Sequence, residues 1–365
     1  MDFLPTTLGT RPRLAVEVKA EGVVAARAEN AAALLTAVAR VVVAEGAVMP
    51  GLKPGNIVDR AGVVAAVRSA LDDVAGKGSE RGVGRDVTVI VPDAAVRVLL
   101  LDFDQLPSKA AEALPVVRFR LKKLLPFDAD AASVSYQVMA SERGAVRVMA
   151  VAMPKDVLAE YEDVVAAAGY LPGAVLPSTL ATLAGLDSTE IPALVVNAGQ
   201  GGVTTAIVKG GILLLHRALD LNANTEDAVA VAIPMAGELP GAAWDGQPQT
   251  ELSRFDAEAV LASVVEKAEM REMAVAAKVQ STANEVTQAV SVAAAYFEDS
   301  LQVAPEVLLA AGTIGADRLV AILEASGLEG LRVQEMVAAG MLEAGAVTAS
   351  VPRGWLAGVR GALKS

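Results

Sequence analysis

Apolar residues in the first third of the chain fall in short alternating or continuous runs, a pattern typical of strands. Polar and small residues separate the runs and predict turns. Five strands are expected before residue 104, over residues 13–18, 23–29, 36–43, 87–91 and 96–103. The alanine-rich segment before the third run leaves a helix open there. Apolar residues at helical spacing predict a helix over residues 59–74, between the third and fourth strands.

Residues 101–137 combine a strand end, a basic amphipathic helix and the start of a new strand. Steps of three and four predict one buried helix face, made of Leu114, Val117, Leu121 and Leu124. Four cations lie among these positions, namely Arg118, Arg120, Lys122 and Lys123. Ser108 is the expected N-cap, Pro115 either kinks the helix or marks its first turn, and Pro126 ends it. The cations either form a solvated helix face, the commoner case, or bind acidic lipid or a partner peptide.

The two halves of the chain open alike. Alternating runs at residues 133–139 and 146–153 predict a hairpin, and helices are expected over residues 155–168 and 177–186. Small-residue turns then separate three further strands, over residues 193–197, 203–209 and 211–217. Each half thus has three strands followed by a helix, which indicates an internal structural duplication. The remaining expected elements are a linker at 233–251, helices at 254–278, 281–300 and 312–326, a strand at 306–310, and a terminal helix within 351–365.

The composition is that of a globular protein long enough for two or three domains, with 365 residues of which 53% are hydrophobic. Aromatic residues make up only 3%, so Val, Ala and Leu must build the core. Close packing of such small side chains favours an α/β fold. The sequence has no Cys and one His, which excludes disulfides, thiolate metal sites and His-rich metal sites. A net charge of -12 argues against nucleic-acid binding.

The N-terminus lacks the charged and apolar regions of a signal peptide. No run approaches the roughly 20 apolar residues that span a bilayer. We therefore expect a soluble, cytoplasmic protein that reaches a membrane only through a partner.

His216 and the terminal helix around Trp355 each have a structural and a functional explanation. His216 ends an apolar run without a nearby Ser or Asp motif, which favours a structural or edge-strand position over catalysis. The terminal helix around Trp355 either docks on a membrane or partner, or packs onto the body of the protein, which we favour.

The most specific pattern is LDFDQLP, then a helix ending KKLLPFD, then SVSYQV. VTVIVPD precedes it, and VRVMAVAMPKD and AAAGYLPGAVLPSTLATL follow. This order resembles the PilM family, actin-like cytoplasmic proteins of the type IV pilus inner-membrane platform that are related to FtsA. The resemblance covers most of the chain and implies a two-domain, actin-like α/β fold (the ASKHA class, a duplicated ribonuclease-H-like unit) with a small inserted αβ subdomain.

The resemblance also implies domain boundaries. The first actin-like domain would span residues 1–190, with a partner-binding subdomain inserted at about 96–153. The second would span residues 191–350 and include a helical subdomain at about 234–303. Residues 351–365 would form a C-terminal tail helix.

Actin-like enzymes hold ATP and magnesium between two phosphate hairpins, each a strand ending Asp-x-Gly. By resemblance, the nucleotide-binding candidates are Glu17, Lys19, Asn197, Gly199, Gly201, Gly202, Thr204, Gly312 and Gly315. Glu17 takes the acidic place of the first hairpin, and Lys19 either contacts phosphate or is a solvated turn residue. Asn197 replaces the second Asp and offers magnesium no charge. These departures favour weak nucleotide binding or none, so an enzyme is not expected, and ATP with magnesium is the only cofactor left open.

The resemblance further implies a function in assembly. Such a protein binds the cytoplasmic N-terminal segment of a PilN-like bitopic membrane protein in a groove beside the inserted subdomain. The candidate partner-binding residues are Arg118, Phe119, Lys122, Lys123 and Phe127. The pilus motor ATPase and a second copy of the chain are further candidate partners. The alternatives are an active ATPase of the same fold and a GspL-like component of type II secretion, which would carry its own membrane span.

Overall fold

The computed structural model describes residues 12–76, 85–142, 144–187, 189–221, 279–328, 330–343 and 351–364. The chain divides into one unit of Met1–Leu221 with Val286–Ser365 and a second unit of Asn222–Glu285. The described part of the second unit, residues 279–285, is helical, as are residues 286–301 of the first. The helix expected at 281–300 is therefore confirmed, whereas the linker at 233–251 and the helix at 254–278 lie outside the described residues. All elements below belong to the first unit.

The first sheet contains three of the expected strands as a meander and adds two parallel ones. Its strands are β1 (Leu14–Lys19), β2 (Gly22–Ala28), β3 (Leu35–Val42), β4 (Asp86–Val91) and β8 (Leu171–Pro177), in the order β3-β2-β1-β4-β8. β1, β2 and β3 pair antiparallel, and β4 and β8 run parallel to β1. The third apolar run is thus a strand and not a helix. β8 was not predicted, because its two prolines and one glycine obscure the strand pattern, and prolines are tolerated on this edge position.

The second sheet repeats the first strand for strand. It contains β9 (Ala193–Gly199), β10 (Gly202–Lys209), β11 (Ile212–Asp220), β12 (Val307–Ala311) and β13 (Arg332–Glu335), in the order β11-β10-β9-β12-β13. β9, β10 and β11 form the antiparallel meander, and β12 and β13 run parallel to β9. The predicted duplication is confirmed by this matching order. β13 was not predicted because it has only four residues, two of them charged.

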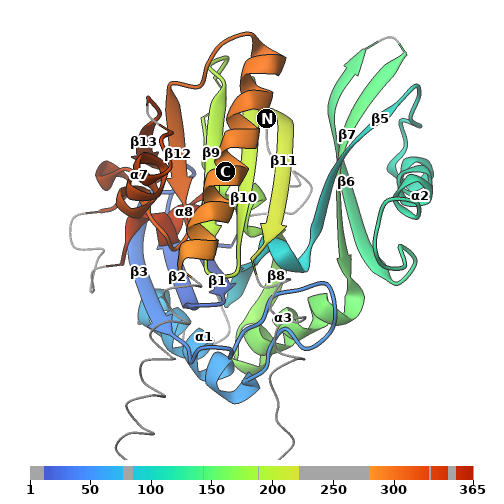
Figure 1. Cartoon of the computed structure of the whole chain (residues 1–365). Coiled ribbons are helices and arrows are strands. Elements are labelled where there is room, and N and C mark those ends of the chain that lie inside the picture. The colour runs from blue at the N-terminus through green and yellow to red at the C-terminus, as the bar shows by residue number, and fades with distance from the viewer. Residues whose placement is uncertain are drawn as a thin grey trace, which may run out of the picture. The chain divides into compact units, whose positions relative to one another are not determined.

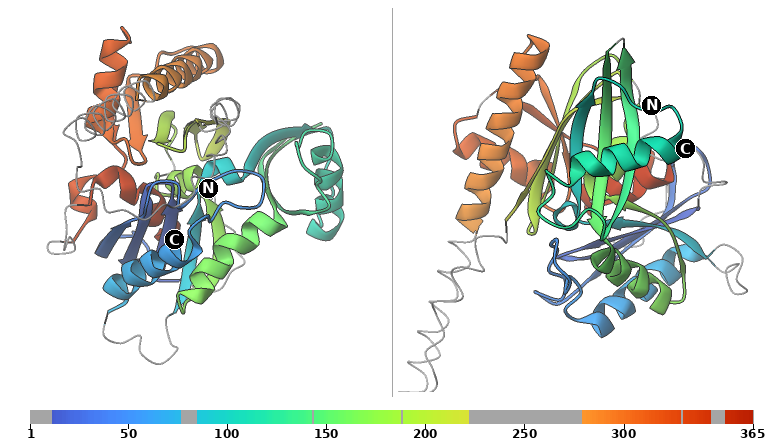
Figure 2. Two further views of the ribbon diagram at one scale, coloured as in Figure 1. Left: turned by 60° about the horizontal axis from the view of Figure 1, so that its bottom comes forward. Right: turned by 90° about the vertical axis from the view of Figure 1, so that its right-hand side faces the viewer.

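A third sheet and one helix form a separate module, which we call the third-sheet module (residues 97–154). It consists of β5 (Arg97–Phe103), α2 (Ala110–Leu121), β6 (Ala132–Glu142) and β7 (Ala145–Pro154), with the strand order β5-β7-β6. One sheet face packs with α2 in a core that includes Val117, Leu121 and Val148. Figure 2 shows α2 lying across the strands on the outer face of this sheet. The hairpin expected from the runs at 133–139 and 146–153 is the antiparallel pair β6–β7.

The bounds and faces of α2 differ from the sequence prediction. The helix begins after Lys109 and not at Ser108, and Pro115 lies inside it. It ends at Leu121, five residues before Pro126, because residues 122–124 tighten into a turn. Leu124 therefore leaves the helix and is 49% exposed. The buried face is Ala113, Val117 and Leu121, at steps of four, while Leu114 is only half-buried.

Helices cover both faces of the first sheet. α1 (Arg60–Ala75) and α3 (Lys155–Ala167) pack on one face, whereas α4 (Ser178–Ala184) and α8 (Ala357–Leu363) lie on the other (Figure 1). Asp59 caps α1 by accepting from the Gly62 amide at 3.0 Å. On the second sheet, α7 (Ala316–Ala325) and the helical residues 286–301 cover one face, and α4 and the third-sheet module cover the other. The short 3-10 helices are η1 (Asp93–Ala95), η2 (Ala339–Met341) and η3 (Arg353–Leu356).

The C-terminal helix is part of the core. Trp355 is only 6% exposed, and every residue of α8 is buried. Arg360 and Lys364 donate to the Gly185 carbonyl oxygen, each at 3.2 Å, which ties α8 to the end of α4. Packing onto the body of the protein, the favoured expectation for this segment, is confirmed. No helix of the described residues is long and apolar enough to cross a membrane.

Candidate functional site

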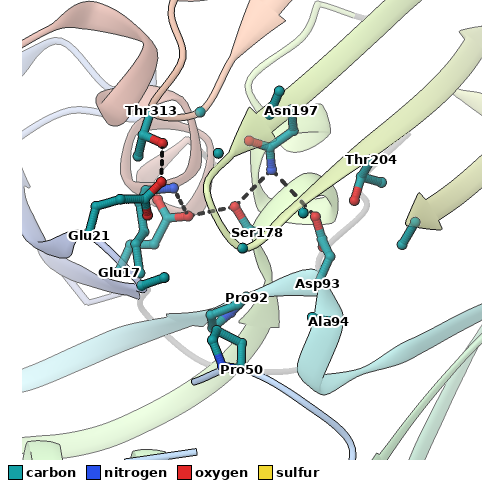
Figure 3. Close-up of a pocket in the computed structure, with 18 of the residues that line it drawn as sticks. Glu17, Glu21, Pro50, Pro92, Asp93, Ala94, Ser178, Asn197, Thr204 and Thr313 are labelled. Carbon is teal, nitrogen blue, oxygen red and sulfur yellow. Dashed lines mark hydrogen bonds and ion pairs between the residues drawn. The ribbon is translucent and has the colours of Figure 1, made fainter. Parts of the chain in front are cut away.

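The turns at corresponding ends of the two sheets meet around a small pocket. The β1–β2 turn, the β9–β10 turn, the loops after β4 and β12, and the start of α4 all contribute lining residues (Figure 3). The cavity volume is about 70 Å³, well below the about 300–1,000 Å³ of typical small-molecule sites. Eight nucleotide-binding candidates line it, namely Glu17, Lys19, Asn197, Gly199, Gly201, Gly202, Thr204 and Gly312. Gly315 does not, and instead precedes α7 at its N-terminus.

Glu17 is fully buried, and its negative charge is compensated by Lys19 of the same strand, β1. Its Oε1 accepts from the Ser178 hydroxyl at 2.5 Å and forms an ion pair with the Lys19 ammonium. The Lys19 side chain is only 11% exposed, so it is not the solvated turn residue that the sequence left open. The Glu17 Oε2 has no hydrogen-bond partner within the described residues and lies against Gly358 of α8, where a Cβ would be 2.5 Å away.

Asn197 donates where the family pattern expects a carboxylate. Its Nδ2 lies 2.9 Å from the Ser178 hydroxyl, 3.0 Å from the Thr179 hydroxyl and 3.4 Å from Asp93 Oδ2. Asp93 in turn accepts from the Thr179 amide at 3.0 Å and from its hydroxyl at 2.5 Å. An aspartate at position 197 would place a second negative charge beside Asp93 and provide no donor. The asparagine therefore suits a closed hydrogen-bond network that joins the two halves without a metal ion.

Glu21 reaches from the first hairpin to the second. Its Oε1 accepts from the Gln200 amide at 2.5 Å and from the Thr313 hydroxyl. Gly199 permits this approach, since a Cβ there would lie 2.8 Å from the Thr313 hydroxyl and 3.0 Å from Glu21 Oε1. Figure 3 shows Glu21 and Thr313 pointing toward each other above Glu17.

Backbone amides of the loop after β12 are also bonded to groups of the chain itself. The Gly312 amide donates to the Gly354 carbonyl at 2.9 Å, and the Ile314 amide donates to the Ala198 carbonyl at 3.1 Å. Glu335 caps α7 by accepting from the Ala316 amide at 2.9 Å. A helix N-terminus that would attract an anion is thus already served by a carboxylate of the chain.

The residues present do not fit ATP with magnesium in this arrangement. The described residues contain no group of three or more acidic, His or Cys side chains placed to hold a metal ion. The pocket lining holds three carboxylates, Glu17, Glu21 and Asp93, against the one ammonium of Lys19. Its formal charge of -2, three negative groups and one positive, opposes a polyphosphate that carries no metal ion.

Several residues of this network were not among the sequence candidates: Glu21, Asp93, Ser178, Thr179 and Thr313. The sequence offered a reason to consider Asp93, because it follows Pro92 at the end of a predicted buried strand. Ser178 and Thr179 begin a predicted helix, where hydroxyls are common. No sequence pattern pointed to Glu21 and Thr313, since they are 292 residues apart and meet only in the folded chain.

His216 lies outside the pocket lining, on the edge strand β11. Its Nε2 is buried and has no hydrogen-bond partner within the described residues. Burial lowers the pKa of His216, and the Asp93 carboxylate opposes this shift. The position is structural and at a sheet edge, as expected.

The five partner-binding candidates differ in how they are placed. Arg118 is half-buried and donates to the carbonyl oxygens of Ala129, in a short contact, and Ala132, at 3.1 Å. Lys122 pairs with Asp130 at 2.5 Å, and this bond lowers the pKa of the Asp130 carboxyl. Phe127 is half-buried against the core of the third-sheet module.

Phe119 on the outer face of α2 and Lys123 in the turn that follows the helix are both exposed. Phe119 is 67% exposed, and the Lys123 ammonium lies 5.8 Å from the centre of its ring. Val116, one turn earlier on the same face, is also exposed. The outer face of α2 therefore presents an apolar stripe with a cation at its end, opposite the buried Ala113, Val117 and Leu121.

Comparison with solved structures identifies the fold. A chain of the PilM–PilN type IV pilus biogenesis complex matches with a TM-score of 0.65 and 18% identity, over 96% of this chain and 98% of that chain. Ethanolamine utilization protein EutJ from Carboxydothermus hydrogenoformans matches with a TM-score of 0.42 and 12% identity, over 98% and 90% of the two chains. The cytoplasmic domain of EpsL, an inner-membrane component of the type II secretion system of Vibrio cholerae, gives 0.37 and 16%, over 62% and 78%.

No protein-family model matches the sequence, and no curated protein does. The structural likeness to the PilM–PilN complex and the two matching sheets confirm the expected actin-like α/β fold in its PilM-like form.

Proposed function

We propose that this chain is an adaptor of a type IV pilus or related secretion platform, and that it binds the cytoplasmic N-terminal segment of a PilN-like bitopic membrane protein. The observation that carries the proposal is the likeness to the PilM–PilN complex along almost the whole length of both chains. The hydrogen bonds of the pocket support the proposal as well. Donors of the kind that bind phosphate are already bonded to Glu21 and Glu335 of the same chain, which suits partner binding better than ATP hydrolysis. Such a chain would lie at the cytoplasmic face of the inner membrane, held there by its partner.

The outer face of α2 is the part of the third-sheet module that we propose contacts the partner. Phe119 and Val116 offer exposed apolar surface, and Lys123 and Arg120 offer exposed positive charge beside it. Exposed aromatic and cationic side chains of this kind are enriched among residues that dominate binding energy at interfaces. Arg118 and Lys122 are less informative targets, since both already hold the loop that follows α2.

The test is calorimetric titration of the full chain with a synthetic peptide. The peptide has the sequence of the cytoplasmic N-terminal segment of the proposed PilN-like bitopic partner. We expect binding that weakens at least about tenfold in Phe119→Ala and in Lys123→Glu, because each removes a group at the proposed contact. Ile191→Ala and Lys209→Glu serve as matched controls, since both residues are exposed elsewhere on the surface. No heat from the intact peptide with folded wild-type protein would end the adaptor proposal.

The same titration separates the two kinds of platform. A peptide from a type IV pilus partner and one from a type II secretion partner are compared on one protein preparation, and the tighter binder identifies the system. The pilus motor ATPase and a second copy of the chain stay predictions as partners.

A further inference from the structure

Two loops that lie far apart in the sequence meet at one carboxylate. The Gln200 amide in the β9–β10 turn and the Thr313 hydroxyl after β12 both donate to Glu21 Oε1. A backbone N–H in a glycine-rich turn and a neighbouring hydroxyl form the kind of donor set that binds phosphate oxygens. Here an acidic side chain of the β1–β2 turn accepts from both. The contact is tight, because even a methyl group at Gly199 would lie within 3.0 Å of Glu21 Oε1 and Thr313 Oγ1.

A lysine of the chain likewise occupies the position beside the buried Glu17, where a bound cation would lie. The Lys19 ammonium forms an ion pair with the fully buried Glu17. A buried carboxylate needs a compensating positive charge, and Lys19 supplies it from two residues further along β1. Glu17 therefore has its counter-ion within the chain and does not depend on a metal ion for one.

We propose that Glu21 is an internal ligand that occupies the anion position of this pocket and holds the two hairpins together without nucleotide. Lys19 plays the corresponding part for a cation. The ligand class excluded by this arrangement is a phosphate-type anion such as pyrophosphate or a nucleoside triphosphate. Removal of the Glu21 carboxylate vacates the two donors and lowers the negative charge of the lining by one. The pocket of that variant is predicted to accept a phosphate-type anion.

The experiment compares the full wild-type chain with Glu21→Ala, Glu21→Gln and the control Glu324→Ala, whose carboxylate lies on the exposed side of α7. Each protein is melted and titrated with sodium pyrophosphate and with ATP plus magnesium. We expect no melting shift and no binding heat for the wild type and the control. Glu21→Ala should melt about 2–4 °C lower, bind pyrophosphate at least tenfold more tightly than the wild type, and regain melting temperature on binding.

Glu21→Gln separates charge from shape. Its amide oxygen can still accept from Gln200 and Thr313, so its melting temperature should lie between those of the wild type and Glu21→Ala. Thr313→Val, which keeps Glu21 but removes one donor, provides a second measurement if Glu21→Ala does not fold. A double-mutant cycle between Glu21→Gln and Thr313→Val should then be non-additive.

Two results would overturn the proposal. One is wild-type protein that binds ATP with magnesium as tightly as Glu21→Ala does, since the carboxylate would then be no obstacle. The other is a Glu21→Ala variant that melts like the control and gains no anion affinity, since the contact would then hold nothing together. Peptide binding by the outer face of α2 is a separate readout, so failure of this proposal can be told apart from failure of the adaptor proposal, which rests mainly on the likeness to the PilM–PilN complex.

Discussion

His216 places an ionisable ring in a part of the sheet that favours its neutral form. Its Nε2 is buried without a hydrogen-bond partner in the described part of the chain, and burial lowers its pKa despite the opposing charge of Asp93. In the unfolded chain the imidazole would titrate at its usual pKa near 6.5. The unfolded state therefore binds this proton more readily than the folded state, and folding stability must rise with pH through this range.

We predict that the wild type loses up to about 1 kcal/mol of unfolding free energy between pH 7.5 and 5.5 through this residue. His216→Leu should flatten that dependence, because it removes the only histidine of the sequence. Urea unfolding of both proteins at three pH values measures the difference, and the carboxylates common to both cancel in the comparison. Equal slopes for the two proteins would show that His216 can be protonated in the folded state at little cost.

In the third-sheet module, cations near the end of α2 hold the loop that follows the helix. The Arg118 guanidinium, from the last turn of α2, donates to the carbonyl oxygens of Ala129 and Ala132. The chain after Leu121 is thereby drawn back along the helix toward the start of β6. The cations that looked alike in the sequence thus divide into Arg118 and Lys122, which hold this loop, and Arg120 and Lys123, which are exposed.

Arg118→Ala should destabilise the protein by about 2 kcal/mol, because it leaves two carbonyl groups without their charged donor. The effect should be local, with faster hydrogen exchange in α2 and residues 122–132 than elsewhere. Lys123→Ala, from the exposed side of the same segment, should change the unfolding free energy by no more than about 0.5 kcal/mol. Equal effects of the two substitutions would contradict the structural part assigned to Arg118.

On the scale of the whole molecule, the last residues of the chain complete the core of the first half. α8 packs against the first sheet beside α4. Its Val359 and Leu363, together with Leu356 of η3, lie among buried residues of β1, β2 and β4. The two helices approach so closely that a Cβ at Gly361 would lie 1.9 Å from the Ala181 carbonyl oxygen. This contact joins segments about 180 residues apart and requires a glycine.

Gly361→Ala should therefore cost about 3 kcal/mol, since the backbones of α4 and α8 must move apart. Gly340→Ala is the matched control, because a Cβ there meets nothing within 4 Å and Gly340 has no positive φ. Chemical unfolding of both variants measures the effect. A Gly361→Ala protein as stable as the control would mean that α8 is free to shift.

Local pattern was sufficient for most of the strands and helices. Alternation and helical spacing act between residues a few positions apart, so β1, β2, α1 and the β6–β7 hairpin could be read directly. The pattern did not predict β8 and β13, because an edge strand needs only one partner strand and tolerates prolines or charged residues. The candidate site was found in part: the glycines and Glu17 follow a hairpin pattern, whereas Glu21 and Thr313 follow none.

The sequence by itself determined the duplicated order of strands, the basic helix and the altered hairpins, because each depends on residue type and short-range spacing. Only the tertiary structure decided how the charged groups are used. It brought Glu21 to Gln200 and Thr313, across 179 and 292 residues, and Arg118 to the carbonyls that follow α2. It also decided between the two explanations of the terminal helix, which is buried against the body of the protein. The physical reason is that a charge or an apolar face finds its partner through topology, which no local pattern encodes.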